Sequence, residues 1–277
     1  MLKQRILTAI VALAILTLVV FALPPVVARI AIAAVFVIGA WEWGGFLYRT
    51  GRLGQLVYVT FVAALMAATW VNAGDPVWLD TLLRVGLAWW MLALVWLLFF
   101  PTPIPVSINW ICGALVLVPA WAAMDHLYTQ YPSKLLFFYL FIVWATDIGA
   151  YFVGKRFGRV KLAPAISPGK TWEGVLGGLA AVALLVTAAS SIIGWELTVL
   201  IPFCLAVAML SIIGDLTVSM FKRTAGVKDS GSLFPGHGGV LDRIDSVTAA
   251  SPLYVYCLLY TSPSPRDRSV SRMPSSA

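Results

Sequence analysis

Charged residues are scarce in this chain. Only 11% of its 277 residues are Asp, Glu, Lys or Arg, whereas 61% are hydrophobic. Average soluble domains carry about 25% charged residues, so the composition excludes an ordinary soluble globular protein. Histidine is nearly absent as well, since the chain has only 2 His. A histidine-based zinc site is therefore not expected.

Paired cysteine spacings and segments of alternating polarity are also missing. Cys112, Cys204 and Cys257 lie in or beside apolar runs without paired spacing, so we interpret them as packing residues rather than disulfide partners or metal ligands. The apolar runs are continuous, whereas a membrane barrel would show short segments of alternating polarity. The net charge of +7 is concentrated in a few loops, and we therefore expect no nucleic-acid partner.

Long apolar runs are what the chain does contain. Runs of roughly 18 or more residues with few charges are typical of membrane helices, whose backbone groups are satisfied internally. The sequence predicts an all-α, polytopic membrane bundle of about eight to nine transmembrane helices. The expected spans are Ile6–Leu23, Ala28–Phe46, Leu56–Val71, Leu82–Phe100, Trp110–Met124, Leu135–Tyr151, Val175–Ile193 and Leu197–Gly214, with a ninth starting near Val247.

The placement of basic residues predicts an orientation. If the N-terminus with Lys3 and Arg5 is cytoplasmic, alternate loops on the same side hold most of the other cations, whereas the opposite loops keep only Arg29, Arg84 and Lys134. Cytoplasmic loops carry such an excess of Lys and Arg. We therefore expect both conspicuous polar loops, 152–174 and 215–246, to face the cytoplasm.

One polar segment, Ser219–Asp245, interrupts the apolar pattern with charges, glycines and the run Pro235–Gly239, PGHGG. Carboxylates at a membrane boundary need water, a cation or a partner, and Mg²⁺ prefers carboxylates, waters and substrate phosphates. Asp215, Asp242 and Asp245 are therefore candidate metal ligands. Two alternatives stay open: Asp215 could be a helix-end residue, and Asp242 could pair with Arg243 or Lys222.

The cations of this segment, Lys222, Arg223, Lys228 and Arg243, are candidate phosphate contacts, since cations beside glycines suit a phosphate site. The alternative is a topology signal attracted to anionic lipid. A rigid glycine turn around a histidine favours the phosphate site, because a topology signal does not require one. His237 could be a phosphate ligand, a general acid or a turn residue.

A second polar segment, Ser167–Gly174, reads SPGKTWEG. It is not a Walker A motif, because position 164 is Pro164 rather than glycine and no strand is expected before it. Ser167, Lys170 and Thr171 could still contact phosphate. The alternative is an ordinary helix start, with Thr171 as the cap and Glu173 complementing the helix dipole. Asp147 and Glu42 are carboxylates within apolar runs, which makes them functional candidates facing the bundle interior or a cavity.

The order of these motifs resembles a known family. Ser219–Asp245 has the layout S-x-x-K-R, K-D-S, P-G-H-G-G and D-R-x-D, and SPGKTWEG, DIGAY at Asp147–Tyr151 and the opening MLKQRIL…LPP match as well. The chain resembles the phosphatidate cytidylyltransferases, also called CDP-diacylglycerol synthases, of bacterial type. The resemblance implies an Mg²⁺-dependent nucleotidyltransferase of phospholipid biosynthesis in the bacterial inner membrane. Its substrates would be CTP and phosphatidic acid, and its products CDP-diacylglycerol and pyrophosphate.

The resemblance also assigns roles to residues. Asp215 and Asp242 would bind the metal or a metal pair, with Asp245 and Asp229 secondary. The remaining members of the expected site are the phosphate contacts Lys222, Arg223, Lys228 and Arg243, the pocket residues Asp147, Ser167, Lys170, Thr171, Ser219, Gly238 and Gly239, and His237. It leaves open a second cation and the oligomeric state, a homodimer included.

The last part of the chain departs from the family pattern. We expect N-terminal membrane helices over 1–134, a catalytic membrane region over 135–256 and a non-native tail over 257–277. The tail begins CLLYTSPSPRD at Cys257–Asp267, which resembles the translation of a transposon adapter used in sequencing libraries.

Three alternative functions fit the sequence less well. CDP-alcohol phosphotransferases carry D-G-x-x-A-R, which does not occur here. A membrane transporter would accommodate Asp147 and Glu42, but transporters commonly show internal repeats and broken helices, and the sequence shows no convincing repeat. A purely structural membrane scaffold would leave the PGHGG turn unexplained.

Overall fold

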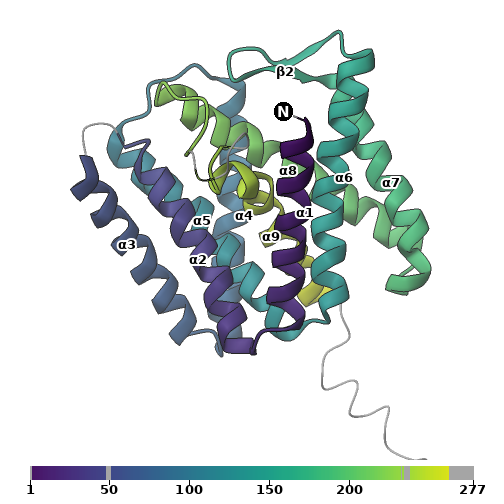
Figure 1. The fold of residues 1–277 in the computed structure, drawn as a ribbon, viewed down its shortest axis with the longest axis horizontal. Coiled ribbons are helices and arrows are strands. Elements are labelled where there is room, and N and C mark those ends of the chain that lie inside the picture. Colours follow the sequence, from purple (N-terminus) through teal and green to yellow (C-terminus); the bar gives the residue numbers. More distant parts are fainter. Residues whose placement is uncertain (1, 48–50, 232, 234–237, 262–277) are drawn as a thin grey trace, which may run out of the picture.

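The computed structural model describes residues 2–47, 51–231, 233 and 238–261. Nine helices account for most of these described residues, and their order confirms the expected all-α bundle (Figure 1). They are α1 (Leu2–Phe21), α2 (Pro25–Gly44), α3 (Gly51–Val71), α4 (Pro76–Leu98), α5 (Val106–Gln130), α6 (Ser133–Phe157), α7 (Trp172–Ile193), α8 (Leu197–Thr224) and α9 (Leu241–Thr261).

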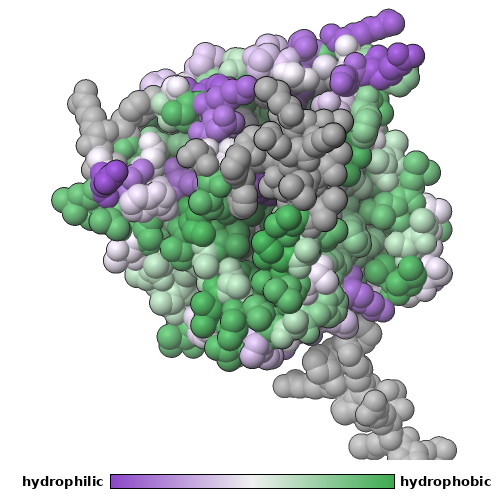
Figure 2. Space-filling view, viewed as in Figure 1, coloured by the Kyte–Doolittle hydropathy of each residue, from purple (hydrophilic) through white to green (hydrophobic). Residues whose placement is uncertain are grey.

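Seven of the described helices, α2 to α8, are long and apolar enough to cross a membrane. In Figure 2 the body of the visible face is covered by hydrophobic residues, and hydrophilic residues gather mainly at the end where the N-terminus and β2 lie. Leu176 and Leu184 of α7 are 66% and 74% exposed, as expected for side chains that face lipid. The chain is therefore a polytopic membrane bundle.

Several predicted spans are shorter than the helices, and two of these differences concern the polar segments. The eighth span was expected to end at Gly214, but α8 continues to Thr224, and the ninth was expected from Val247, but α9 begins at Leu241. The polar residues at these ends do not break the helices because their side chains find partners. Within α8, the Ser219 hydroxyl donates to Asp215 one turn earlier, over 3.2 Å.

A short hairpin connects α6 to α7. Strand β1 (Lys161–Ala163) pairs antiparallel with β2 (Ser167–Thr171). The expectation that no strand precedes Gly169–Thr171 was therefore wrong, because these residues lie within β2 itself. The motif is still not a Walker A loop, which would place its glycines between a strand and a helix. Thr171 caps α7 by accepting from the Gly174 amide over 3.2 Å, as the helix-start interpretation predicted.

Glycines allow α6 and α7 to pack closely. A Cβ atom added at Gly149 would lie 2.6 Å from the Gly177 carbonyl oxygen and 2.7 Å from the Cβ of Ala181. At Gly178 it would lie 2.7 Å from the Thr146 carbonyl oxygen. Small residues at such an interface let helix backbones approach in a membrane protein. This contact holds the hairpin at the end of the bundle.

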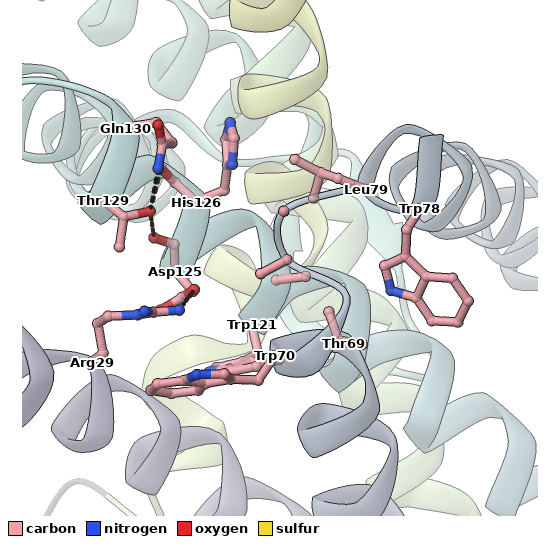
Figure 3. Close-up of a pocket in the computed structure, with 13 residues that line it drawn as sticks. Arg29, Thr69, Trp70, Trp78, Leu79, Trp121, Asp125, His126, Thr129 and Gln130 are labelled. Atoms are coloured by element: carbon pink, nitrogen blue, oxygen red, sulfur yellow. Dashed lines mark hydrogen bonds and ion pairs between the residues drawn. The ribbon is translucent and has the colours of Figure 1, made fainter. Parts of the chain in front are cut away.

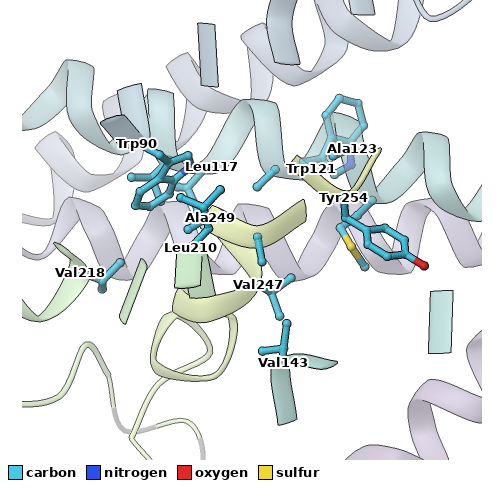
Figure 4. Close-up of a cluster of buried hydrophobic side chains, with 14 of the residues drawn as sticks. Trp90, Leu117, Trp121, Ala123, Val143, Leu210, Val218, Val247, Ala249 and Tyr254 are labelled. Atoms are coloured by element: carbon cyan, nitrogen blue, oxygen red, sulfur yellow. The ribbon is translucent and has the colours of Figure 1, made fainter. Parts of the chain in front are cut away.

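Helix α9 lies in the centre of the bundle. Figure 4 shows Ala249 and Tyr254 of α9 among buried side chains of neighbouring helices, including Trp90 and Leu117. The Tyr139 hydroxyl of α6 donates to the Val247 carbonyl of α9 over 2.7 Å. Because α9 is surrounded by protein, it tolerates a more polar sequence than the helices that face lipid. The second turn of α9 is thereby fixed against α6.

Candidate functional site

The polar segments meet at one end of the bundle. The hairpin β1–β2, the end of α8 and the start of α9 lie at the same end, where the N-terminus of α1 also lies (Figure 1). Arg223 of α8 joins two of these elements, since its Nε donates to the Ile166 carbonyl over 3.0 Å. Two segments more than forty positions apart in the sequence therefore form a single polar region.

The first ion pair of this region links the hairpin to α8. Lys170 Nζ lies 2.7 Å from Asp215 Oδ2, and Asp215 Oδ1 accepts from the Ser219 hydroxyl. The side chains of Lys170 and Asp215 are 26% and 29% exposed, so the pair is reachable from outside. Asp215 lies within α8 rather than at its end, which excludes the helix-end alternative.

The second ion pair links α8 to α9. Lys222 Nζ lies 2.7 Å from Asp242 Oδ1, and the two side chains are only 9% and 6% exposed. Asp242 Oδ2 accepts from the amides of Ser230 and Gly239, each over 2.9 Å. The alternative in which Asp242 pairs with Lys222 is therefore confirmed. Burial alone would raise the pKa of Asp242, but Lys222 and the two amides outweigh it and hold that pKa below its usual value.

Three carboxylates are grouped near the first ion pair. Asp147 of α6, Asp215 of α8 and Asp245 of α9 lie close enough for their charges to interact. Asp245 is 7% exposed, and its Oδ1 accepts from the Ser246 amide over 2.8 Å. Such a group of like charges favours a bound cation or a cationic partner.

The donor chemistry of this group fits a divalent cation. Mg²⁺ is usually bound through one or two carboxylates, with waters and substrate phosphates completing its shell, and Asp215 and Asp245 supply two carboxylates. Among the described residues, no group of three or more His, Cys, Asp or Glu side chains is arranged to hold a metal ion by itself.

The other expected site residues are placed as follows. Arg243 of α9 is exposed near Asp147, and Lys228 and Asp229 are exposed in the segment between α8 and α9. Ser167 is half-buried in β2, and Thr171 uses its hydroxyl for the helix cap. Gly238 has φ of 79°, which only glycine adopts readily. His237 lies outside the described residues.

The sequence named Glu42 as a functional candidate but gave it no role in this region. Glu42 of α2 accepts hydrogen bonds from Ser230, Val240 and Leu241. The only indication in the sequence was that Glu42 is a carboxylate within an apolar run. Because Glu42 belongs to 1–134, the polar region draws on both halves of the proposed division at residue 135.

A cavity of about 220 Å³ lies where α3 ends, α4 begins and α5 ends (Figure 3). These helix ends lie at the end of the bundle away from the hairpin (Figure 1). The cavity contains none of the expected site residues. Arg29 donates two hydrogen bonds of 2.7 Å to the Asp125 carboxylate there. The Arg29 guanidinium lies 4.0 Å from the centre of the Trp70 ring. These charges satisfy each other, so we interpret them as a link between α2 and α5.

The chain is similar to proteins of one family over nearly its whole length. The model of the family described as "Cytidylyltransferase family" matches residues 3–261. A Pseudomonas aeruginosa protein named phosphatidate cytidylyltransferase is 44% identical over 267 residues, which cover 93% of this chain and 97% of that protein. A Haemophilus influenzae protein of the same name is 39% identical over 282 residues, 92% of this chain and 98% of that protein. The chain belongs to the cytidylyltransferase family.

Proposed function

We propose that this protein transfers the cytidylyl group of CTP to phosphatidic acid, which yields CDP-diacylglycerol and pyrophosphate. The observation that carries the proposal is the pair of Lys–Asp bridges, Lys170–Asp215 and Lys222–Asp242, at one end of a membrane bundle. Two near relatives bear the name phosphatidate cytidylyltransferase. The transporter alternative is not favoured, because the chain belongs to a family of nucleotidyltransferases.

The reaction brings two anions together. A phosphate oxygen of phosphatidic acid attacks the α-phosphorus of CTP, and a new P–O bond forms. The bond from the α-phosphorus to the oxygen bridging to the β-phosphate breaks, and pyrophosphate leaves with that electron pair. The attacking phosphate is already ionised near neutral pH, so the site needs no strong general base. This agrees with a site rich in Asp and Lys.

Electrostatic stabilisation is the main task of the site residues. Lys170, at 26% side-chain exposure, is available to a phosphate that competes with Asp215. Lys228 and Arg243 are exposed beside the same region and are proposed to attract the triphosphate. Lys222 is buried in its ion pair with Asp242, so we propose that its role is to hold α9 against α8. Fixed charges aimed at developing charge are usually the largest contribution to catalysis.

A divalent cation, which we propose to be Mg²⁺, would be held by Asp215 and Asp245, and when bound it would neutralise phosphate charge and stabilise the leaving pyrophosphate. The assignment of Asp242 to the metal stays a prediction. Both of its oxygens already accept hydrogen bonds, so we propose that it also holds the backbone of Ser230 and Gly239 beside the start of α9.

We further propose that the site faces the cytoplasm of a bacterial inner membrane, since CTP is made inside the cell and the basic loops lie at this end. Purified membranes containing the protein should convert labelled CTP into lipid-extractable label when phosphatidic acid is added. Membranes with the Asp215→Asn variant, at equal protein level, serve as the control. Equal lipid label from both preparations would refute the proposal.

A further inference from the structure

Glu42 connects the N-terminal helices to the polar region. It lies near the end of α2 and is only 6% exposed, yet its three partners are 188 to 199 positions later in the chain. An ionised carboxylate inside a protein is costly unless it is fully hydrogen-bonded. Both of its oxygens meet this requirement. Oε1 accepts from the Val240 amide over 2.9 Å, and Oε2 accepts from the Leu241 amide over 2.7 Å and the Ser230 hydroxyl over 2.8 Å.

These contacts cap α9 from another helix. Leu241 is the first residue of α9, and the first amides of a helix have no acceptor within the helix. A negative charge at this position also interacts favourably with the helix dipole. Glu42 therefore supplies the N-terminal cap that a neighbouring Ser or Asp would normally provide. It fixes the position of the turn that carries Asp242.

Two glycines, Gly231 and Gly239, leave room for the Glu42 carboxylate. A Cβ atom at Gly231 or Gly239 would collide with the Glu42 carboxylate, so only glycine lets the chain approach this closely. Asp242 also binds this backbone, through the amides of Ser230 and Gly239. Ser230 is thus held twice, by its amide to Asp242 and by its hydroxyl to Glu42.

We propose that Glu42 is a positioning residue for the cytidylyl transfer: it fixes Ser230, Val240 and Leu241 and, through them, the Asp242–Lys222 pair. This inference rests on the proposed function. Glu42 acts through these contacts and does not touch substrate. A residue that only stabilised the fold would lower stability without changing the apparent affinity for CTP, and this difference makes the two roles separable.

The chain provides a matched control for this test. Asp125 is also 6% exposed and also accepts two hydrogen bonds from a residue distant in the sequence, Arg29. It lies at the other end of the bundle. Asp125→Asn and Glu42→Gln therefore both weaken a buried carboxylate between helices, but only Glu42→Gln disturbs the polar region.

The experiment compares steady-state kinetics of the whole protein in detergent micelles. In Glu42→Gln the amide nitrogen faces backbone donors, and we expect kcat/KM for CTP to fall by about ten- to a hundredfold, the range for losing a hydrogen bond to a charged group. The KM for phosphatidic acid should change less than the KM for CTP. Ser230→Ala removes only one contact, so it should shift kcat/KM for CTP in the same direction by a smaller factor. Asp125→Asn should leave both KM values unchanged.

Amide hydrogen exchange provides a readout that does not depend on activity. Exchange at Val240 and Leu241 should accelerate in Glu42→Gln and stay at the wild-type rate in Asp125→Asn. If Glu42→Gln does not fold, Ser230→Ala carries the kinetic test alone. Wild-type kinetics in the folded Glu42 or Ser230 variant, or an equal loss in Asp125→Asn, would overturn the positioning role. A wild-type protein inactive on CTP would instead refute the proposed function, and hydrogen exchange would still report on the contact.

Discussion

Lys170 of the hairpin and Asp215 of α8 form an ion pair of 2.7 Å, although they belong to two polar segments separated by an entire membrane helix. The pair is partly exposed, with the Lys170 side chain 26% and the Asp215 side chain 29% accessible. Its value for stability is therefore modest, since exposed pairs contribute about 0–1 kcal/mol. We propose a role in the reaction for this pair because it lies near Asp147 and Asp245.

Replacing Lys170 tests whether the ion pair matters more for activity than for stability. Lys170→Met should lower kcat/KM by about ten- to a hundredfold, because a charge-assisted contact to phosphate is lost, while the melting temperature should change little. Steady-state kinetics and thermal unfolding of the purified protein measure the two effects. Lys170→Arg keeps the charge and should retain more activity than Lys170→Met. Full activity of Lys170→Met would exclude Lys170 from the site.

Removing the Asp242 charge should affect both folding and activity. Asp242→Asn leaves Lys222 buried without its partner, and breaking a buried ion pair in this way costs about 3–5 kcal/mol. We expect a lower melting temperature and loss of turnover that depends on a divalent cation, without loss of membrane insertion. Cell fractionation, thermal unfolding and the CTP assay check these three results. Normal turnover in this variant would contradict both proposed roles of Asp242.

The lowered pKa of Asp242 predicts a pH dependence of stability. Because the folded state holds this pKa below its usual value, the stabilisation is fully present above the unfolded pKa of about 3.9 and is lost as the pH falls through the folded pKa. Thermal unfolding at a series of pH values should show a melting temperature that falls as the pH is lowered below about 4. Asp242→Asn should lack this contribution, and an identical acid profile for both proteins would contradict the prediction.

The contact between α6 and α7 predicts a packing defect. Gly149→Val places a side chain where the Gly177 carbonyl oxygen would lie 2.6 Å from the Cβ alone, and overpacking of this kind costs about 1–3 kcal/mol or more. We expect a lower melting temperature and a displaced hairpin with reduced activity. Gly74→Ala is the control, since no atom lies within 4 Å of the added Cβ. Equal stability of both variants would show that α6 and α7 are not packed this way.

Most of the fold could be predicted from the sequence because membrane helices leave long apolar runs. The ends of α8 and α9 could not, since Asp215, Lys222 and Asp242 suggest a loop until their partners are known. The hairpin was missed because strands of 3 and 5 residues are too short to show an alternating pattern. The tail assignment stays a prediction: α9 runs to Thr261, and 262–277 lie outside the described residues.

The sequence identified residues of the proposed site but did not show how they pair. The motifs identified Lys170, Asp215, Lys222 and Asp242, and the structure pairs them as Lys170–Asp215 and Lys222–Asp242. Such pairings depend on the packing of helices, which residue spacing does not define. Glu42 is the clearest example, because nothing near it in the sequence indicates a contact with Leu241, 199 positions later.

The position of the CTP label tests the central claim most directly. Purified protein is incubated with phosphatidic acid and a divalent cation, together with CTP labelled at either the α- or the γ-phosphate. Cleavage between the α- and β-phosphates predicts that α-label enters the lipid fraction and γ-label leaves as pyrophosphate. Both should require phosphatidic acid and disappear in Asp215→Asn. Label from the γ-phosphate in the lipid, or no lipid label from either CTP, would contradict the proposed cytidylyl transfer.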